Sequence, residues 1–146
     1  MGYFWSLFFQ NLKKKGEIMD YYKLTKWECN IIQVGLDHIK EEFDFLTSEQ
    51  RVQIQNLNNL LMDFCTITKN KYDLNQKKRF LDGNRKAFGF YFYEYSFSIM
   101  AITEIYIMHQ DLLVGYKFHQ VEDEEIEFSK DVIKGCKSAF KKLLEG

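Results

Sequence analysis

The chain has 146 residues, of which 46% are hydrophobic, 17% aromatic and 28% charged. This length supports one domain and buries about two-thirds of the surface that the unfolded chain would expose. Because 20 basic residues are balanced by 21 acidic ones, the composition excludes a disordered chain and a protein that coats nucleic acid by net charge alone.

The choice of residues is biased in two ways. There is no proline, and 17 of the 20 basic residues are lysine, which leaves only Arg51, Arg79 and Arg85. A/T-rich coding produces this bias, since proline and arginine codons are mostly rich in G and C, so we expect a low-GC bacterium, a phage or a mobile element as the source. Because proline is the strongest helix breaker, its absence also favours long helices.

The N-terminal segment joins an apolar stretch to three lysines. In a secretory signal the positive charge precedes the apolar stretch and a small-residue cleavage site follows it, and residues 1–18 show neither feature. The ten residues Tyr3–Leu12 are also too few to cross a bilayer. We therefore expect a cytoplasmic protein without a membrane partner.

The codons of residues 15–19 could contain a signal for the start of translation. Their codons can be AAA-GGA-GAA-ATT-ATG, which contains a purine-rich ribosome-binding sequence shortly before an ATG. We hypothesise that Met19 is the native start, that residues 1–18 are a non-native or weakly ordered extension, and that residues 19–146 form a single globular domain. An intact mass of native protein that includes Met1 would contradict this hypothesis.

Two capped helices are predicted in the first half of this domain. Thr25–Glu28 and Thr47–Gln50 have the capping-box pattern, in which a Thr hydroxyl accepts from the third helical amide and the Glu or Gln reaches back. The short link between them predicts an antiparallel helical hairpin over about 25–68. Apolar residues at helical spacing follow each box: Ile32, Leu36, Ile39 and Phe43, and then Ile54, Leu57, Leu61 and Phe64.

The polar side chains of residues 88–108 scatter around a helical wheel and form no polar stripe. As a strand the segment alternates over Tyr93–Ile99, but a strand of 21 residues would be about 70 Å long at about 3.3 Å per residue. A central helix buried on most sides, ending at Gly115, fits the length better. A membrane-spanning helix also fits the length, but Glu94 and Glu104 are costly in lipid.

Ser129 is placed to cap a last helix, in which apolar residues recur at helical spacing. The predicted fold is mainly α: a small helical bundle with the helical hairpin (about 25–68), a buried aromatic element (about 87–113) and a C-terminal amphipathic helix (about 129–144). The alternative is an α+β fold with strands within 88–121. Between the hairpin and the aromatic element, a short helix near 74–81 followed by a loop is expected. The apolar stripe of the last helix is Val132, Cys136, Ala139 and Leu143.

The sequence contains no catalytic motif and no Gly-rich phosphate loop. The cysteines, Cys29, Cys65 and Cys136, lack metal-ligand spacing and lie in or beside apolar helical stripes, so we expect reduced thiols in the core. His38 and Glu42, one helical turn apart, are the best local pair for a metal, but such pairs are common on solvated helices. We expect neither a cofactor nor a resident metal.

Glu94 and Glu104 are the sharpest candidates for acid–base chemistry, since carboxylic acids inside an aromatic segment can serve as general acid and base. They are ten residues apart, which on a helix separates them by about 15 Å along the axis and about 80° around it. They cannot act on one substrate atom together. We therefore expect a protein that is not an enzyme, in which each carboxylate meets a lysine, a tyrosine hydroxyl or water.

Charge is segregated along the chain. Residues 69–86 carry a net charge of +5, residues 121–128 carry −5 and residues 129–146 carry +3. On a small chain without catalytic motifs, such segregation indicates electrostatically steered binding to another macromolecule. The candidate binding residues come from the first two blocks: Lys69, Lys71, Tyr72, Lys77, Lys78, Arg79, Arg85, Lys86, Glu122, Asp123, Glu124, Glu125 and Glu127.

These features predict a non-catalytic protein-binding module that forms a stoichiometric complex, such as a phage or mobile-element inhibitor or an immunity protein. The expected partner is a protein, and association with a second copy of the chain is compatible with the same pattern. The alternative is a nucleic-acid-binding regulator that uses residues 69–86, because lysine-dominated stretches contact phosphates with little sequence preference.

Overall fold

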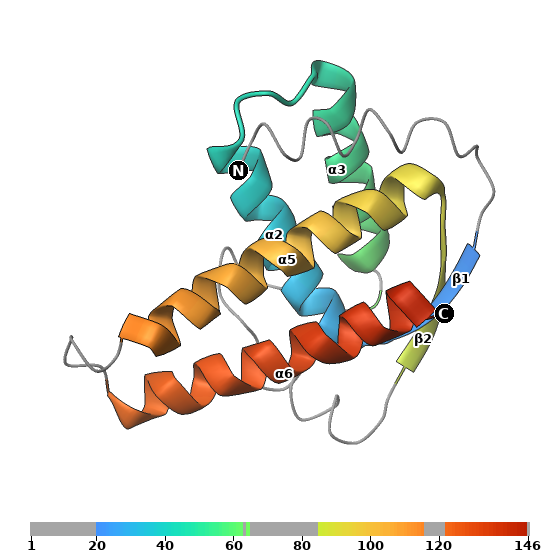
Figure 1. Ribbon diagram of the computed structural model, residues 1–146. Coiled ribbons are helices and arrows are strands. Elements are labelled where there is room, and N and C mark those ends of the chain that lie inside the picture. Colours follow the sequence, from blue (N-terminus) through green and yellow to red (C-terminus); the bar gives the residue numbers. More distant parts are fainter. Residues whose placement is uncertain (1–19, 63, 65–84, 116–121, 146) are drawn as a thin grey trace.

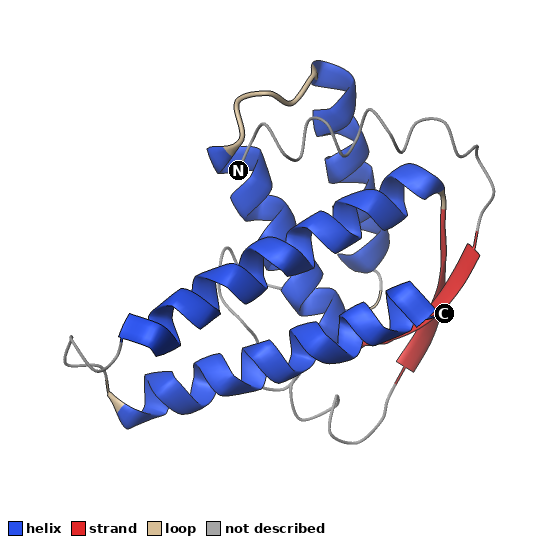
Figure 2. Cartoon of the chain, viewed as in Figure 1, coloured by secondary structure: helices blue, strands red, loops and turns tan. Residues whose placement is uncertain are grey.

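The computed structural model of the chain describes residues 20–62, 64, 85–115 and 122–145. Within these residues the fold is mainly helical, as predicted, with one two-stranded antiparallel sheet (Figure 1, Figure 2). The N-terminal extension and the short helix expected near 74–81 lie outside the described residues. The elements are, in chain order, β1 (Asp20–Thr25), α2 (Lys26–Glu42), α3 (Ser48–Met62), β2 (Arg85–Phe90), α5 (Phe92–Gly115) and α6 (Asp123–Glu145).

Both predicted capping boxes form. At the start of α2, the Thr25 amide donates to Glu28 Oε1 at 2.8 Å and the Glu28 amide donates to Thr25 Oγ1 at 3.1 Å. At the start of α3, the Thr47 amide donates to Gln50 Oε1 at 2.8 Å and the Gln50 amide donates to Thr47 Oγ1 at 3.1 Å. Each box therefore supplies side-chain acceptors for two main-chain amides that have no hydrogen-bond partner within the helix.

α2 and α3 form the predicted antiparallel hairpin. Lys40 Nζ donates to Gln55 Oε1 at 2.8 Å near the connecting loop, and Gln33 Nε2 donates to the main-chain oxygen of Asn58 at 3.5 Å further along. Arg51 Nη1 also donates to the main-chain oxygen of Lys40 at 3.0 Å, which ties the two helices together beside the loop. α3 buries only a narrow stripe: Ile54, Leu57 and Leu61.

α2 is the central helix of the described fold. Every residue from Trp27 to Leu36 is buried, and the helix contacts α3, α5 and α6. Its closest neighbour is α5, because a Cβ added to Gly35 would lie only 2.4 Å from the main-chain oxygen of Ala101. The two helices therefore cross with their main chains in contact (Figure 1).

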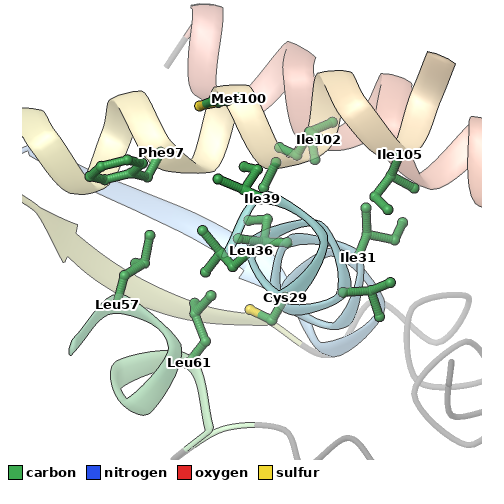
Figure 3. Close-up of a cluster of buried hydrophobic side chains, with 14 of the residues drawn as sticks. Cys29, Ile31, Leu36, Ile39, Leu57, Leu61, Phe97, Met100, Ile102 and Ile105 are labelled. Carbon is green, nitrogen blue, oxygen red and sulfur yellow. The ribbon is translucent and has the colours of Figure 1, made fainter. Parts of the chain in front are cut away.

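The hydrophobic core lies where α2 meets α3 and α5 (Figure 3). Its apolar side chains come from the predicted stripes of the hairpin and of α6, from the first half of α5 and from the sheet, so the amphipathic pattern identified the inner faces of the helices correctly. The labelled residues are Cys29, Ile31, Leu36, Ile39, Leu57, Leu61, Phe97, Met100, Ile102 and Ile105.

The segment 88–108 divides between two elements. β2 ends at Phe90 and α5 begins at Phe92, so the helix interpretation is confirmed for most of the segment and only its first residues belong to a strand. The hydroxyls of Ser96, Ser98 and Thr103 each donate to the main-chain oxygen four residues earlier, at 2.8 Å. Because the helix itself satisfies these hydroxyls, they can scatter around its axis without forming a polar face.

α5 is, in the described part of the chain, the one helix that is long and apolar enough to cross a membrane. It packs against α2 and α6, and it buries the carboxylates of Glu94 and Glu104. Those contacts are the ones expected of a helix in the core of a helical domain.

The sheet joins two strands that are distant in sequence. β1 was not predicted, because its six residues form a strand only by pairing with β2, about sixty residues later. On the inner side of the sheet, the ring of Tyr22 lies 5.7 Å from that of Tyr95 on α5 between centroids, and the ring of Phe88 lies 5.8 Å from that of Phe64, just after α3. These aromatic contacts anchor the sheet to the helical core.

α6 begins at Asp123, six residues before the predicted start at Ser129, so that prediction was wrong. The amides of Glu125 and Ile126 donate to the main-chain oxygen of Glu122, at 3.0 Å and 3.2 Å. Carboxylates are favourable in a first helical turn, because the unpaired amides and the helix dipole present positive charge there. The acidic run is thus the N-terminus of the helix itself and not a segment that precedes it.

Glu28 joins α2 to α6. Its carboxylate is 0% exposed and accepts hydrogen bonds from the Ser138 hydroxyl at 2.7 Å and from Lys142 Nζ at 2.5 Å, besides the Thr25 amide of its capping box. The Lys142 side chain is 19% exposed. One side chain therefore both starts α2 and fixes the last turns of α6 against it.

Candidate protein-binding surface

Glu94 and Glu104, the predicted acid–base candidates, are both buried on α5 but make separate contacts. Glu94 Oε1 accepts from the Tyr91 amide at 3.0 Å, which satisfies an amide at the start of α5. Burial raises the pKa of Glu94, and this hydrogen bond opposes the rise. Glu104 Oε2 instead lies 3.8 Å from His38 Nε2, across the interface between α2 and α5. Each carboxylate thus has its own local structural contact.

The side chains of His109 and Ser129 lie as close together as those of a catalytic base and its nucleophile. His109 Nδ1 lies 2.9 Å from Ser129 Oγ and connects α5 to α6. Ser129 is buried, and the His109 ring packs edge-on against Phe128 with centroids 6.1 Å apart. Because a nucleophile must be reached by its substrate, we interpret this pair as an interior hydrogen bond between two helices.

The His109 contact predicts a pH dependence of stability. Burial lowers the pKa of His109 from its ordinary value of 6.5, so folding favours the neutral ring. The stability that this group contributes is complete above that ordinary value and is lost as the pH falls through the folded-state pKa. We expect His109→Gln, which keeps a hydrogen-bonding group but does not titrate, to lose less unfolding free energy than the wild type between about pH 7.5 and about pH 5. Urea unfolding at both pH values measures the loss, and equal losses would contradict the prediction.

The two described cysteines, Cys29 and Cys136, are buried. Burial raises the pKa of Cys136 to about 12, so this thiol stays protonated and is a poor nucleophile. Among the residues that the structure describes, no group of three or more His, Cys, Asp and Glu side chains is placed to hold a metal ion. Cys65 and His119 lie outside the described residues.

The predicted acidic residues lie at the start of α6, and all of them are exposed. α5 and α6 run antiparallel, as the contacts of Tyr106 with Phe140 and of His109 with Ser129 show, so the acidic run lies beside the C-terminal end of α5 (Figure 1). The acidic residues are Glu122, Asp123, Glu124, Glu125 and Glu127.

The C-terminal end of α5 carries apolar residues that are not buried, together with His109, Gln110 and Asp111. No residue from Tyr106 to Gly115 is buried, and Met108 and Val114 are 45% and 70% exposed. Residues 107–114 of α5, together with residues 122–127 of α6, are called the acidic–apolar end below. Its acidic half is visible in the sequence and its apolar half is not, because the exposure of an apolar helix depends on which other elements pack against it. The apolar residues are Ile107, Met108, Leu112, Leu113 and Val114.

The basic candidates are described only in part. Arg85 and Lys86 are exposed on β2, and Lys86 Nζ lies 5.5 Å above the centre of the Phe88 ring. The sheet lies near the C-terminal end of α6, whereas the acidic run lies at its N-terminal end (Figure 1). Because α6 has 23 residues, its two ends are about 33 Å apart along the helix. The acidic and basic candidates described by the structure therefore belong to different surfaces. Lys69, Lys71, Tyr72, Lys77, Lys78 and Arg79 lie outside the described residues.

Comparison of the chain with protein-family models, curated proteins and solved structures found no match. The class of the protein therefore rests on its own architecture, which is a small, mainly α domain that carries a two-stranded antiparallel sheet.

Proposed function

We propose that this protein is a non-catalytic binding module that forms a stoichiometric complex with a protein partner through its acidic–apolar end. The observation that carries the proposal is the lack of burial from Tyr106 to Gly115 on a helix without a polar face. A helix that is apolar on every side is normally covered on every side. Exposed apolar surface bordered by charge is typical of protein–protein interfaces.

The partner that fits this surface presents apolar side chains among lysines or arginines. Met108 and Val114 would enter the apolar part of the interface, where most binding energy arises. The carboxylates of residues 122–127 would face the partner's cations at the rim and accelerate its approach. The same five carboxylates would repel a polyphosphate, so this end favours a protein over a nucleic acid.

In this proposal the complex is inhibitory. The small size of the chain, its A/T-rich coding bias and its segregated charges fit a cytoplasmic inhibitor encoded by a phage or mobile element, or an immunity protein that neutralises a toxin. Such proteins act by occupying a surface of their target, which needs affinity and shape but no catalytic group.

The test uses the full chain and the partner that it captures from the source cells. We expect the purified partner to bind with a stoichiometry close to one, and Met108→Glu/Val114→Glu to raise the Kd by about 100-fold or more, as loss of central apolar contacts does. Glu124→Gln/Glu125→Gln should slow association several-fold and leave dissociation nearly unchanged. Calorimetry and surface plasmon resonance measure these quantities.

Val52→Glu is the matched control, because Val52 is an exposed apolar residue of α3, outside the acidic–apolar end. It should change the Kd by no more than about twofold. The proposal fails if the variant of Met108 and Val114 binds the partner like the wild type. It also fails if light scattering finds a wild-type dimer that this variant dissociates, because a second copy would then cover the surface.

A further inference from the structure

The two-stranded sheet exposes one of its faces. Paired residues of an antiparallel sheet point to the same face, and successive residues alternate between faces. The register pairs Tyr21 with Gly89 and Lys23 with Ala87, and Arg85 lies two residues before Ala87 on the same strand. These five residues are called the ribbon face; Thr25, which pairs with Arg85 on the same face, is buried. The opposite face packs inward with Tyr22, Leu24, Phe88 and Phe90.

Tyr21 presents an uncovered aromatic ring on the ribbon face. It is 70% exposed, and its cross-strand partner Gly89 has no side chain that could cover it. Tyr91, two residues after Gly89, is also exposed, and its ring stacks on Tyr93 with centroids 6.2 Å and planes 11° apart. Because tyrosine rings carry a large apolar area, two exposed rings at one end of a sheet mark a binding surface.

The charges on the ribbon face are positive. Lys23 and Arg85 are both exposed there, whereas Asp20 and Lys86 lie on the other face. Arg85 also lies within the basic stretch 69–86, which carries a net charge of +5. Exposed aromatic rings and cations on one small sheet form a surface that suits a flexible polyanion with planar groups.

We propose that the ribbon face binds single-stranded nucleic acid, with a base stacked on Tyr21 and phosphates in contact with Lys23 and Arg85. Stacking on an aromatic ring accepts any base, and the cations follow the backbone, so the binding tolerates many sequences. Double-stranded nucleic acid does not fit, because its bases are already stacked on one another. The ribbon face and the acidic–apolar end lie near opposite ends of α6, so this inference is independent of the proposed protein complex (Figure 1).

The test is fluorescence anisotropy of a labelled oligo(dT) of about 15 nucleotides, titrated with the full chain over a salt series. We expect Tyr21→Ala to raise the Kd by about 10-fold or more, and Tyr21→Phe, which keeps the ring, to stay within about twofold of the wild type. Lys23→Ala/Arg85→Ala should reduce the slope of log K against log salt by about 1.4, because each lost phosphate contact removes about 0.7.

Lys130→Ala is the matched control, since Lys130 is an exposed lysine near the other end of α6 and should leave the slope unchanged. Equal Kd values for the wild type and Tyr21→Ala would overturn the inference, as would equally tight binding of a duplex of the same length. Competition by poly-glutamate as effective as that by oligo(dT) would also overturn it and would identify an acidic protein segment as the ligand. The protein complex is tested separately by the variant of Met108 and Val114, so either proposal can fail alone.

Discussion

Gly35→Ala is expected to lower the free energy of unfolding by about 2 kcal/mol or more, although alanine favours a helix over glycine by about 1 kcal/mol. The reason lies where α2 crosses α5. A Cβ on Gly35 would lie 2.4 Å from the main-chain oxygen of Ala101 and 2.7 Å from its Cβ. Main-chain atoms inside a helix cannot move aside alone, so the two helices would separate and loosen the core between them. Urea unfolding followed by far-UV circular dichroism measures the loss.

Two comparison variants separate the contact from other effects of the substitution. Gly135→Ala places a Cβ 2.5 Å from Ile31 Cδ1 and 2.6 Å from Trp27 Nε1, which are side-chain atoms that can partly adjust, so its loss should be smaller. Asn59→Ala on the exposed side of α3 should be neutral or slightly stabilising. A Gly35→Ala protein as stable as the wild type would show that α2 and α5 are not in main-chain contact.

Local signals in the sequence predicted the helices of the hairpin well. The Thr25 and Thr47 boxes formed as expected because a capping box depends on residues only three positions apart. The apolar stripe of α3 is buried as its spacing predicts, through Ile54, Leu57 and Leu61. The sequence pattern alone was sufficient where both partners of an interaction lie within one helix.

Contacts between distant segments could not be predicted in the same way. β1 exists because its residues pair with β2, and nothing within Asp20–Thr25 identifies that partner. The second function of Glu28 was missed for the same reason. Its place in the capping box is visible in the sequence, but its contact with Lys142 joins residues 114 positions apart.

Only half of the acidic–apolar end could be found from the sequence. A run such as Glu122–Glu127 is visible in any sequence and is almost always exposed. The sequence of α5 is mostly apolar as far as Met108, but burial already stops after Ile105, and the part of the helix next to the acidic run also holds His109, Gln110 and Asp111. Which end of an apolar helix is covered depends on the other elements of the fold. The candidate surface can therefore be recognised only from the structure, in which the positions of α5 and α6 relative to each other are known.

Lys142→Met is expected to lower the free energy of unfolding by about 3 kcal/mol, the cost typical of leaving a buried charge without its ionic partner. Glu28 is 0% exposed, and Lys142 Nζ, at 2.5 Å, supplies the positive charge that faces its carboxylate. Lys141→Met is the matched control, because Lys141 is exposed on the same turn of α6 and should change stability by no more than about 0.5 kcal/mol. Thermal or urea unfolding of the two variants measures the difference.

The double variant Glu28→Gln/Lys142→Met makes this prediction more specific. The glutamine oxygen can still accept from the Thr25 amide, and its amide nitrogen can donate to the Ser138 hydroxyl oxygen, which then reverses its role, but the side chain carries no charge that needs Lys142. We therefore expect the double variant to be more stable than Lys142→Met alone, by about 1 kcal/mol or more, although it contains one further substitution. If the destabilisations were additive, the cost of Lys142→Met would come from lost packing of the lysine side chain. A recovery of stability would instead assign that cost to the unpaired carboxylate of Glu28.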